Sequence, residues 1–170
     1  MSAPLLVADS GPLIALARLD LLALPGRLFE RVLVTAVVWD EVTRAPRPAE
    51  VAPLLACLHA GLIEVLPTPA SASSAPVDLR LDEGEQSAIA LALDVKATLL
   101  IDERLGRASA QAAGLQVIGT LGLLARARQQ GWIGPLRPVL DALAASGYFL
   151  APLLVEQVLQ AVGEHSSGVA

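Results

Sequence analysis

The sequence is poor in the side chains that most chemical sites in proteins use. Cysteine occurs once, at Cys57, which excludes an internal disulfide, and the two histidines, His59 and His165, are too isolated for a zinc site. Aromatic residues make up 3% of the 170 residues, whereas 54% are hydrophobic, mostly Ala, Leu and Val. This aliphatic composition favours helices packed on a parallel sheet. Cys57, inside an apolar helical pattern, is expected to be a buried and inert thiol.

Long hydrophobic runs are also missing, although the mean hydropathy is high at +0.59. Residues 142–155 carry no charge but contain Gly147 and Pro152, and residues 51–63 contain Pro53. Both runs are shorter than the ~18 to 20 apolar residues that a membrane-spanning helix needs. No basic region precedes the first apolar run, as a signal peptide would require. We therefore expect a soluble, cytoplasmic protein that makes no contact with membranes.

Positive charge is scarce as well. The net charge is −5, and the 12 basic residues are 11 arginines and Lys96. Wide, non-specific binding of nucleic acid needs a basic surface, so this composition disfavours it. A compact acidic site with a few arginines beside it is still compatible with the composition.

Short apolar runs alternate with helical patterns along the chain, and no hairpin signal such as Asn-Gly separates them. This order predicts an α/β fold with a parallel sheet and helices on both of its faces. We expect one domain over residues 1–130, a C-terminal helical extension over 131–162 packed on that domain, and a frayed tail over 163–170. The predicted strands cover residues 5–8, 32–34, 63–66, 97–101 and 117–118, and the predicted helices cover residues 13–17, 20–24, 36–44, 49–60, 83–95, 105–113, 120–130, 136–145 and 153–162.

Two acids follow apolar strands directly. Asp9 ends the first strand and Asp102 ends the fourth, and each precedes a helix. Right-handed crossovers bring the carboxyl ends of parallel strands to one edge, so both carboxylates are expected there. The alternative is that each acid only caps the helix that follows it.

Two further acids lie near the starts of helices. On the helix after the second strand, Glu41 projects between two apolar valines, whereas Asp40 lies on the solvated flank. A peripheral surface position is the alternative for Glu41. Asp82 and Glu85 have the spacing of a capping box, yet Glu85 also lies on the small apolar face that packs on the sheet. Capping and ligand roles are both open for Glu85.

Carboxylates gathered at one edge repel one another unless a cation lies among them. Mg²⁺ or Mn²⁺ suits such an oxygen-only site, where it activates water and offsets charge on a phosphodiester. We therefore predict metal-assisted phosphodiester hydrolysis at Asp9, Glu41, Glu85 and Asp102. Ser10 is expected to cap the helix or orient a carboxylate. Arg104 and Arg107 are candidates for holding substrate phosphate, with a solvated helix face as the alternative.

The segments around these acids resemble a PIN domain over about residues 5–130, and most of all the VapC-like proteins of prokaryotes. The likeness lies in VADSGPLIAL at 7–16, VWDEV at 38–42, GEQSAIALA at 84–92 and LLIDER at 99–104. The resemblance implies a three-layer α/β/α sandwich with a five-stranded parallel sheet, extended here by extra C-terminal helices.

The resemblance also implies a Mg²⁺- or Mn²⁺-dependent endoribonuclease that cleaves single-stranded or structured RNA. Such proteins are often the toxin of a toxin–antitoxin pair, with an antitoxin protein as partner, and often form homodimers. By position the acids of the family fall on Asp9, Glu41, Glu85 and Asp102. Many members carry a further acid just past the fourth, where this chain has Glu103 and then Arg104.

Two other functions are compatible with acids at strand ends. A catalytically inactive PIN-like protein would use the acidic edge to bind a partner, and the low pI of about 4.9 favours that alternative somewhat. A phosphoacceptor receiver domain would need a lysine after a late strand. The single lysine, Lys96, precedes a strand instead, so a receiver domain is disfavoured.

Overall fold

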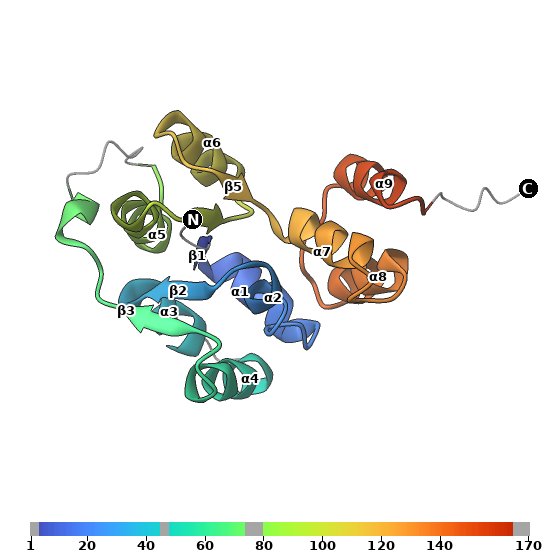
Figure 1. Cartoon of the computed structure of the whole chain (residues 1–170), viewed down its shortest axis with the longest axis horizontal. Coiled ribbons are helices and arrows are strands. Elements are labelled where there is room, and N and C mark those ends of the chain that lie inside the picture. The colour runs from blue at the N-terminus through green and yellow to red at the C-terminus, as the bar shows by residue number, and fades with distance from the viewer. Residues whose placement is uncertain (1–3, 45–47, 74–79, 165–170) are drawn as a thin grey trace, which may run out of the picture. The chain divides into compact units, whose positions relative to one another are not determined.

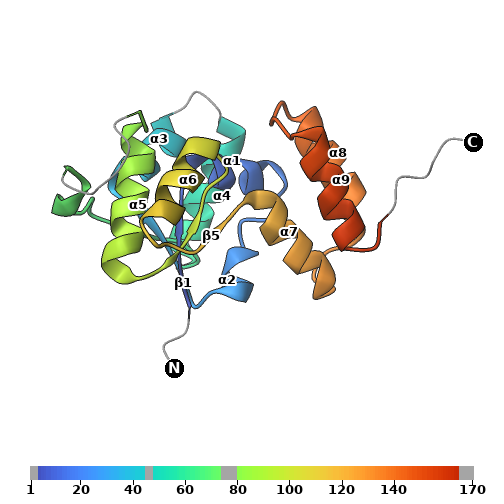
Figure 2. The ribbon, with the colours of Figure 1, turned by 90° about the horizontal axis from the view of Figure 1, so that it is seen from above.

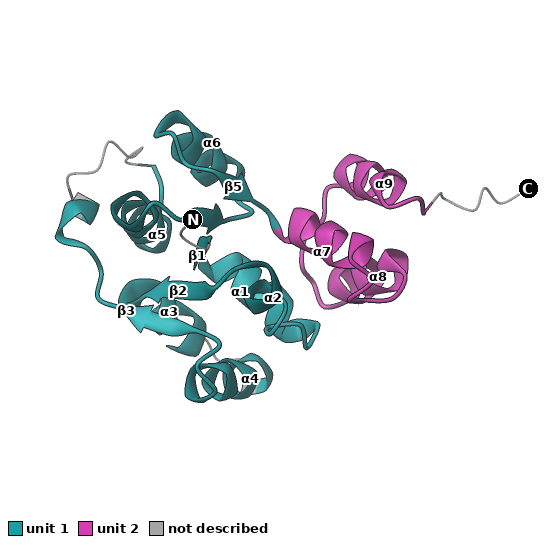
Figure 3. Ribbon diagram, in the orientation of Figure 1, with its two compact units in different colours: residues 1–119 teal, residues 120–170 magenta. Residues whose placement is uncertain are grey.

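The computed structural model describes residues 4–44, 48–73 and 80–164. The chain divides into two compact units, residues 1–119 and residues 120–170 (Figure 3). The boundary between the units precedes the helix over 120–129, and the expected domain over 1–130 with an extension over 131–162 stays a prediction.

The first unit contains a five-stranded sheet whose order is β3-β2-β1-β4-β5, with every pair parallel (Figure 1). This arrangement confirms the predicted α/β fold with a parallel central sheet between helices. The first strand of the chain is the middle of the sheet. The strands are β1 (Leu5–Ala8), β2 (Arg31–Thr35), β3 (Glu64–Leu66), β4 (Thr98–Leu100) and β5 (Val117–Ile118).

Helices cover both sides of this sheet (Figures 1 and 2). Helix α5 contacts β1, β2 and β4, whereas α1 contacts α3 and α4. The helices of this unit are α1 (Ser10–Arg18), α2 (Pro25–Leu28), α3 (Ala36–Arg44), α4 (Pro48–His59), α5 (Glu83–Val95) and α6 (Arg104–Ala112), with a 3₁₀ turn, η1, over Ala70–Ser73.

The core of the first unit is aliphatic and centres on β1. Leu6, Val7 and Ala8 are 0% exposed, because a central parallel strand is covered on both faces. Residues of β4 and α5 complete this layer, among them Leu99, Leu100 and Ile89. Among the described residues, no helix is both long and apolar enough to cross a membrane.

The strand order reverses beside β1, and this positions the candidate site. After β1 the chain builds β2 and β3 on one side, and it then returns to place β4 on the other. Ligands of open α/β sheets bind outside the carboxyl ends of the strands at such a reversal. A hydrogen bond of 3.0 Å from the Asp9 N–H to the Leu100 carbonyl ties the ends of β1 and β4 together there.

The helix predicted over residues 20–24 is wrong. Asp20 has φ +57°, a left-handed conformation that ends α1, and the Leu21 N–H donates to the Leu16 carbonyl at 2.8 Å. Pro25, expected to close a helix, instead begins α2. Proline suits the first position of a helix because its fixed φ is helical and its missing N–H would have no partner there.

Lys96 closes α5 in a left-handed conformation, with φ 54° and ψ 44°. We predict that Lys96→Gly raises the free energy of unfolding by about 0.5–1 kcal/mol, because glycine relieves the steric penalty at this position. Urea unfolding of both proteins measures the difference. Gly114→Ala is the matched opposite: its φ is +86° with open space around the added methyl, so it should destabilise the protein. Equal effects of the two variants would contradict this account.

The second unit consists of α7 (Thr120–Gln129), α8 (Leu136–Ala145) and α9 (Pro152–Ala161). Glu164 accepts hydrogen bonds from the backbone N–H groups of Leu136 and Arg137, at 2.7 and 2.9 Å, and from Nε of Arg128 at 2.9 Å. These bonds at the start of α8 lower the pKa of Glu164. Glu164 belongs to the tail expected to fray over residues 163–170, of which residues 165–170 lie outside the described residues.

Candidate metal centre

Asp9 lies at the carboxyl end of β1, immediately before α1. Its side chain makes no capping hydrogen bond, so the simple helix-cap interpretation does not hold. The residue is 5% exposed, and its Oδ1 is buried without a hydrogen-bond partner. Burial, together with the negative charges of Glu85, Asp82 and Glu41, raises the pKa of Asp9 to about 7, although the Ser10 N–H opposes this. A cation would stabilise a buried carboxylate that has an unpartnered oxygen and like charges around it.

Glu41 reaches this region from α3. Thr35, the last residue of β2, starts α3 by accepting a hydrogen bond from the Val38 N–H at 3.2 Å, and its hydroxyl contacts Ser87 of α5 at 2.7 Å. Glu41 as a residue is exposed, but its carboxylate rests on Gly84 of α5. Burial of that carboxyl group and the charge of Asp82 raise its pKa, against hydrogen bonds from the Ser10 hydroxyl and the Gly84 N–H.

Glu85 is buried in the first turn of α5 and takes part in the predicted capping box. Its Oε2 accepts from the Asp82 N–H at 3.1 Å, while the Glu85 N–H donates to Asp82 Oδ1 at 2.7 Å. Its other oxygen, Oε1, lies toward Gly106 of α6, 3.5 Å from where a Cβ would be. Burial, and then the charges of Asp82, Glu103 and Glu41, raise the pKa of Glu85.

Asp82 is a member of the cluster that sequence reasoning treated only as a cap. Its charge raises the pKa of Asp9, Glu41 and Glu85 alike. The capping-box spacing was the available signal, because that motif places the Asp82 carboxylate beside the first turn of α5. Asp82 is therefore the acid that the three predicted residues share as a neighbour.

Asp102 follows β4 but lies against different neighbours. The cap of α6 is Glu103, whose Oε2 accepts from the Gly106 N–H at 2.8 Å, so Asp102 is not the cap. Asp102 Oδ1 lies 3.0 Å from where a Cβ of Gly119 would be, and Nη1 of Arg107 lies 2.9 Å from the same point. Asp102 thus lies at the same edge of the sheet as Asp9, and its Oδ1 is directed toward the end of β5.

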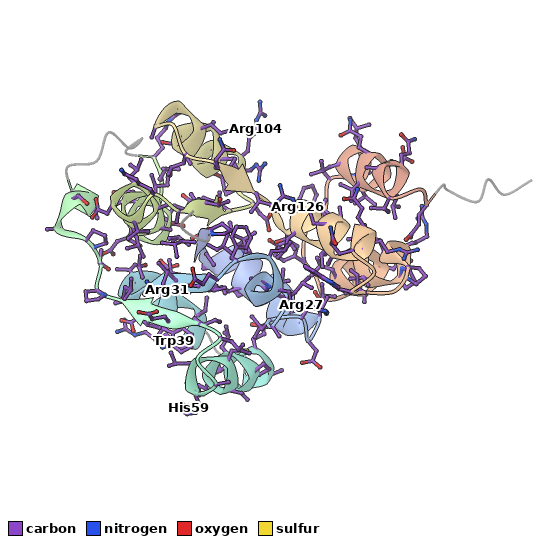
Figure 4. The ribbon with its side chains drawn as sticks, viewed as in Figure 1. Arg27, Arg31, Trp39, His59, Arg104 and Arg126 are labelled. Carbon is purple, nitrogen blue, oxygen red and sulfur yellow. The ribbon has the colours of Figure 1, made fainter. Side chains whose placement is uncertain are left out.

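The two arginines predicted to hold phosphate lie in different surroundings. Nη1 of Arg107 donates to the Ile101 carbonyl at 2.9 Å, which holds this half-buried side chain against the end of β4. Arg104 is exposed on the first turn of α6 (Figure 4). Of the two, Arg104 is the more accessible to a ligand from solvent.

The structure brings Asp9, Glu41 and Glu85 within electrostatic reach of one another and of Asp82. Their oxygens are the donors that hard divalent cations prefer, and the unpartnered Oδ1 of Asp9 is the natural first contact. Among the described residues, however, no group of three or more His, Cys, Asp or Glu side chains already forms a metal-binding set. A cation with three protein ligands therefore requires at least one side chain to rotate. A rotation of Glu85 would break the hydrogen bond that its Oε2 accepts from the Asp82 N–H.

Comparison with known proteins adds the family. None of the curated proteins matches the chain. A family model described as a PIN domain matches residues 5–164, a stretch that includes the sheet and all three C-terminal helices. PIN domains are generally nucleases and typically use divalent metals. With nearly its whole length matched and the parallel sheet in place, the chain belongs to the PIN-domain family.

Proposed function

We propose that this protein is an endoribonuclease that depends on Mg²⁺ or Mn²⁺. The observation that carries the proposal is Asp9: a 5% exposed carboxylate with an unpartnered oxygen, surrounded by like charges at the sheet's ligand-binding edge. A buried acid without a partner either takes up a proton or binds a cation, and the acidic groups around Asp9 favour a cation at this place. The nuclease chemistry general to PIN domains agrees with this assignment.

Each acid has a separate role in the proposed centre. Asp9 supplies the buried anchor, and Glu41, fixed by Ser10 and Gly84, faces it from α3. Glu85, whose Oε2 accepts in the capping box, and Asp102, whose Oδ1 lies near Gly119, would supply further oxygens to the cation. The bound cation would lower the pKa of a water molecule and offset charge on the phosphodiester. Arg104 would hold a phosphate oxygen, and Arg107 would keep the end of β4 in place.

RNA as the substrate, a VapC-like toxin role, an antitoxin partner and a homodimer are finer parts of the proposal. They rest on the likeness of four segments, around Asp9, Glu41, Glu85 and Asp102, to VapC-like proteins. The acidic composition supports a substrate bound at one compact site rather than along a basic surface.

A second candidate is a catalytically inactive PIN-like protein that binds a partner through the acidic edge. The observation that favours it is the lack, among the described residues, of a ready-made group of three metal-binding side chains. The two candidates differ in metal linkage. A nuclease is stabilised by Mg²⁺ or Mn²⁺, because a ligand that binds only the folded state raises its melting temperature. The inactive protein melts at the same temperature with the metal and with EDTA.

The neighbouring acids Asp40 and Glu41 provide a matched test of the site. We predict that Glu41→Gln lowers cleavage of a mixed RNA substrate in Mn²⁺ by about 100-fold, a typical loss for one electrostatic contact to a reacting group. Asp40→Asn should leave the rate unchanged, because Asp40 is exposed and its Oδ2 pairs with Arg44 at 2.9 Å. Initial rates of the purified variants, with EDTA as the blank, give the comparison. If Glu41→Gln cleaved the RNA as fast as Asp40→Asn and the wild type, Glu41 would be excluded from the centre.

A further inference from the structure

Gly84 occupies the second position of α5, directly beneath the Glu41 carboxylate. A Cβ at Gly84 would lie 2.5 Å from Oε2, 2.6 Å from Oε1 and 2.9 Å from Cδ of Glu41. These separations are far shorter than van der Waals contact, so the carboxylate occupies the volume that any other residue's side chain would fill. The Gly84 N–H lies in the first turn of α5, where N–H groups have no partner within the helix, and it donates to this carboxylate.

The clash would fall on Glu41 and not on the backbone. All three atoms nearest to the added methyl belong to the end of the flexible Glu41 side chain. The exposed position of Glu41 leaves space in solvent for the displaced group. Alanine is also a better helix former than glycine. An alanine at position 84 should therefore leave the fold intact while moving the carboxylate away from the start of α5.

We propose that Gly84 is a positioning residue, whose missing side chain lets Glu41 rest on the α5 N-terminus and face Asp9 and Glu85. This inference rests on the proposed function for its consequence in metal binding, but its geometry is independent of that function. Two elements far apart in the sequence, α3 and α5, are joined through this contact. The Thr35–Ser87 hydroxyl contact of 2.7 Å joins the last residue of β2, directly before α3, to α5 as well.

The test compares Gly84→Ala with Gly26→Ala. Gly26 is also the second residue of a helix, α2, and a Cβ there would have nothing within 4 Å. We expect Gly84→Ala to fold with unchanged or higher stability and to bind Mn²⁺ about 10- to 100-fold more weakly, as loss of a group that orients a ligand usually does. Gly26→Ala should bind Mn²⁺ as the wild type does. Calorimetric titration with Mn²⁺ measures both.

A double variant separates positioning from simple disruption. In Gly84→Ala/Glu41→Asp the shorter acid leaves room for the methyl, so Mn²⁺ affinity should exceed that of Gly84→Ala alone. In a Glu41→Gln background, Gly84→Ala should have no further effect, because it acts only through Glu41. If Gly84→Ala lowered Mn²⁺ affinity by the same factor in the Glu41→Asp and Glu41→Gln backgrounds as in the wild type, the proposal would be overturned.

A crystal structure of Gly84→Ala makes the outcome independent of metal binding. We expect the Glu41 carboxylate to have left the backbone nitrogen of residue 84, and a carboxylate still seated there would overturn the inference. If the wild type binds no Mn²⁺, the proposed function fails, while this structural comparison still decides the role of Gly84.

Discussion

Replacing Asp9 by asparagine is expected to abolish RNA cleavage and, at pH 8 without divalent metal, to stabilise the protein. The loss of activity should be at least about 10³-fold, because the variant removes the buried anchor of a metal whose charge stabilisation is worth several kcal/mol. The gain in stability follows from the environment of Asp9. Its carboxylate is 5% exposed, has an unpartnered oxygen, and is surrounded by the charges of Glu85, Asp82 and Glu41.

The direction of the predicted change in stability follows from the raised pKa of Asp9. The pKa of Asp9 is about 7 in the folded protein, against 3.8 as the ordinary value, so between these values the folded state holds a proton that the unfolded state has released. The contribution of Asp9 to stability is therefore fully present below pH 3.8, and it is lost as the pH rises toward 7. The loss amounts to about 4 kcal/mol for this group alone. The asparagine side chain of the variant does not titrate, so the variant escapes this loss.

Urea unfolding at pH 4 and at pH 8 measures the effect. The stability of Asp9→Asn relative to the wild type should be greater at pH 8 than at pH 4. Addition of Mg²⁺ at pH 8 should stabilise the wild type and leave the variant unchanged, since only the wild type carries the anchor. A variant that loses stability equally at both pH values would show that Asp9 is ionised and well paired in the folded state.

Loss of Arg18 is expected to be the most destabilising change to an ion pair among the described residues. Nε of Arg18 in α1 lies 2.6 Å from Oε1 of Glu50 in α4, and the two side chains are only 13% and 9% exposed. Removing one partner leaves the other charge buried. We therefore predict that Arg18→Met lowers the free energy of unfolding by about 3–5 kcal/mol. Chemical unfolding of the metal-free protein measures it.

The exposed pair of Arg31 and Glu64 is the matched control. It joins β2 to β3 with contacts of 2.8 Å, but its side chains are 49% and 46% exposed. Arg31→Met should change the stability by less than about 1 kcal/mol, because water screens such pairs. Arg18→Met/Glu50→Met should recover part of the loss at the buried pair. If Arg18→Met were as mild as Arg31→Met, the buried pair would have no special role in joining α1 to α4.

Hydrophobic spacing and helix caps were sufficient to predict most of the fold. Strand β1, helix α3 and helix α5 lie where apolar runs, Thr35 and the capping box of Asp82 place them. The failure over residues 20–24 has a conformational cause. Asp20 adopts a left-handed φ, which aspartate tolerates, and nothing in the local pattern requires it.

Sequence patterns propose four acids for the candidate site, but they predict neither the geometry around these acids nor the place of Asp82 among them. Strand ends alone predicted that Asp9 and Asp102 share one edge, because that follows from parallel strands. The direction of each carboxylate depends on long-range neighbours: Glu41 rests on Gly84, and Asp102 lies toward Gly119. These contacts join residues that are 43 and 17 positions apart in the sequence, so no local pattern contains them. For the same reason, the second role of Asp82 was hidden behind its cap.

The central position of β1 has a consequence for biosynthesis. Leu6 pairs with Val32 of β2 on one side and with Thr98 of β4 on the other. A nascent chain can complete the first pairing early, but one edge of β1, with its apolar Leu6, Val7 and Ala8, stays open until β4 has left the ribosome. Such unpaired edges are prone to aggregation. Asp102 follows β4 directly, so the proposed RNA-cleaving centre stays incomplete until β4 has joined β1.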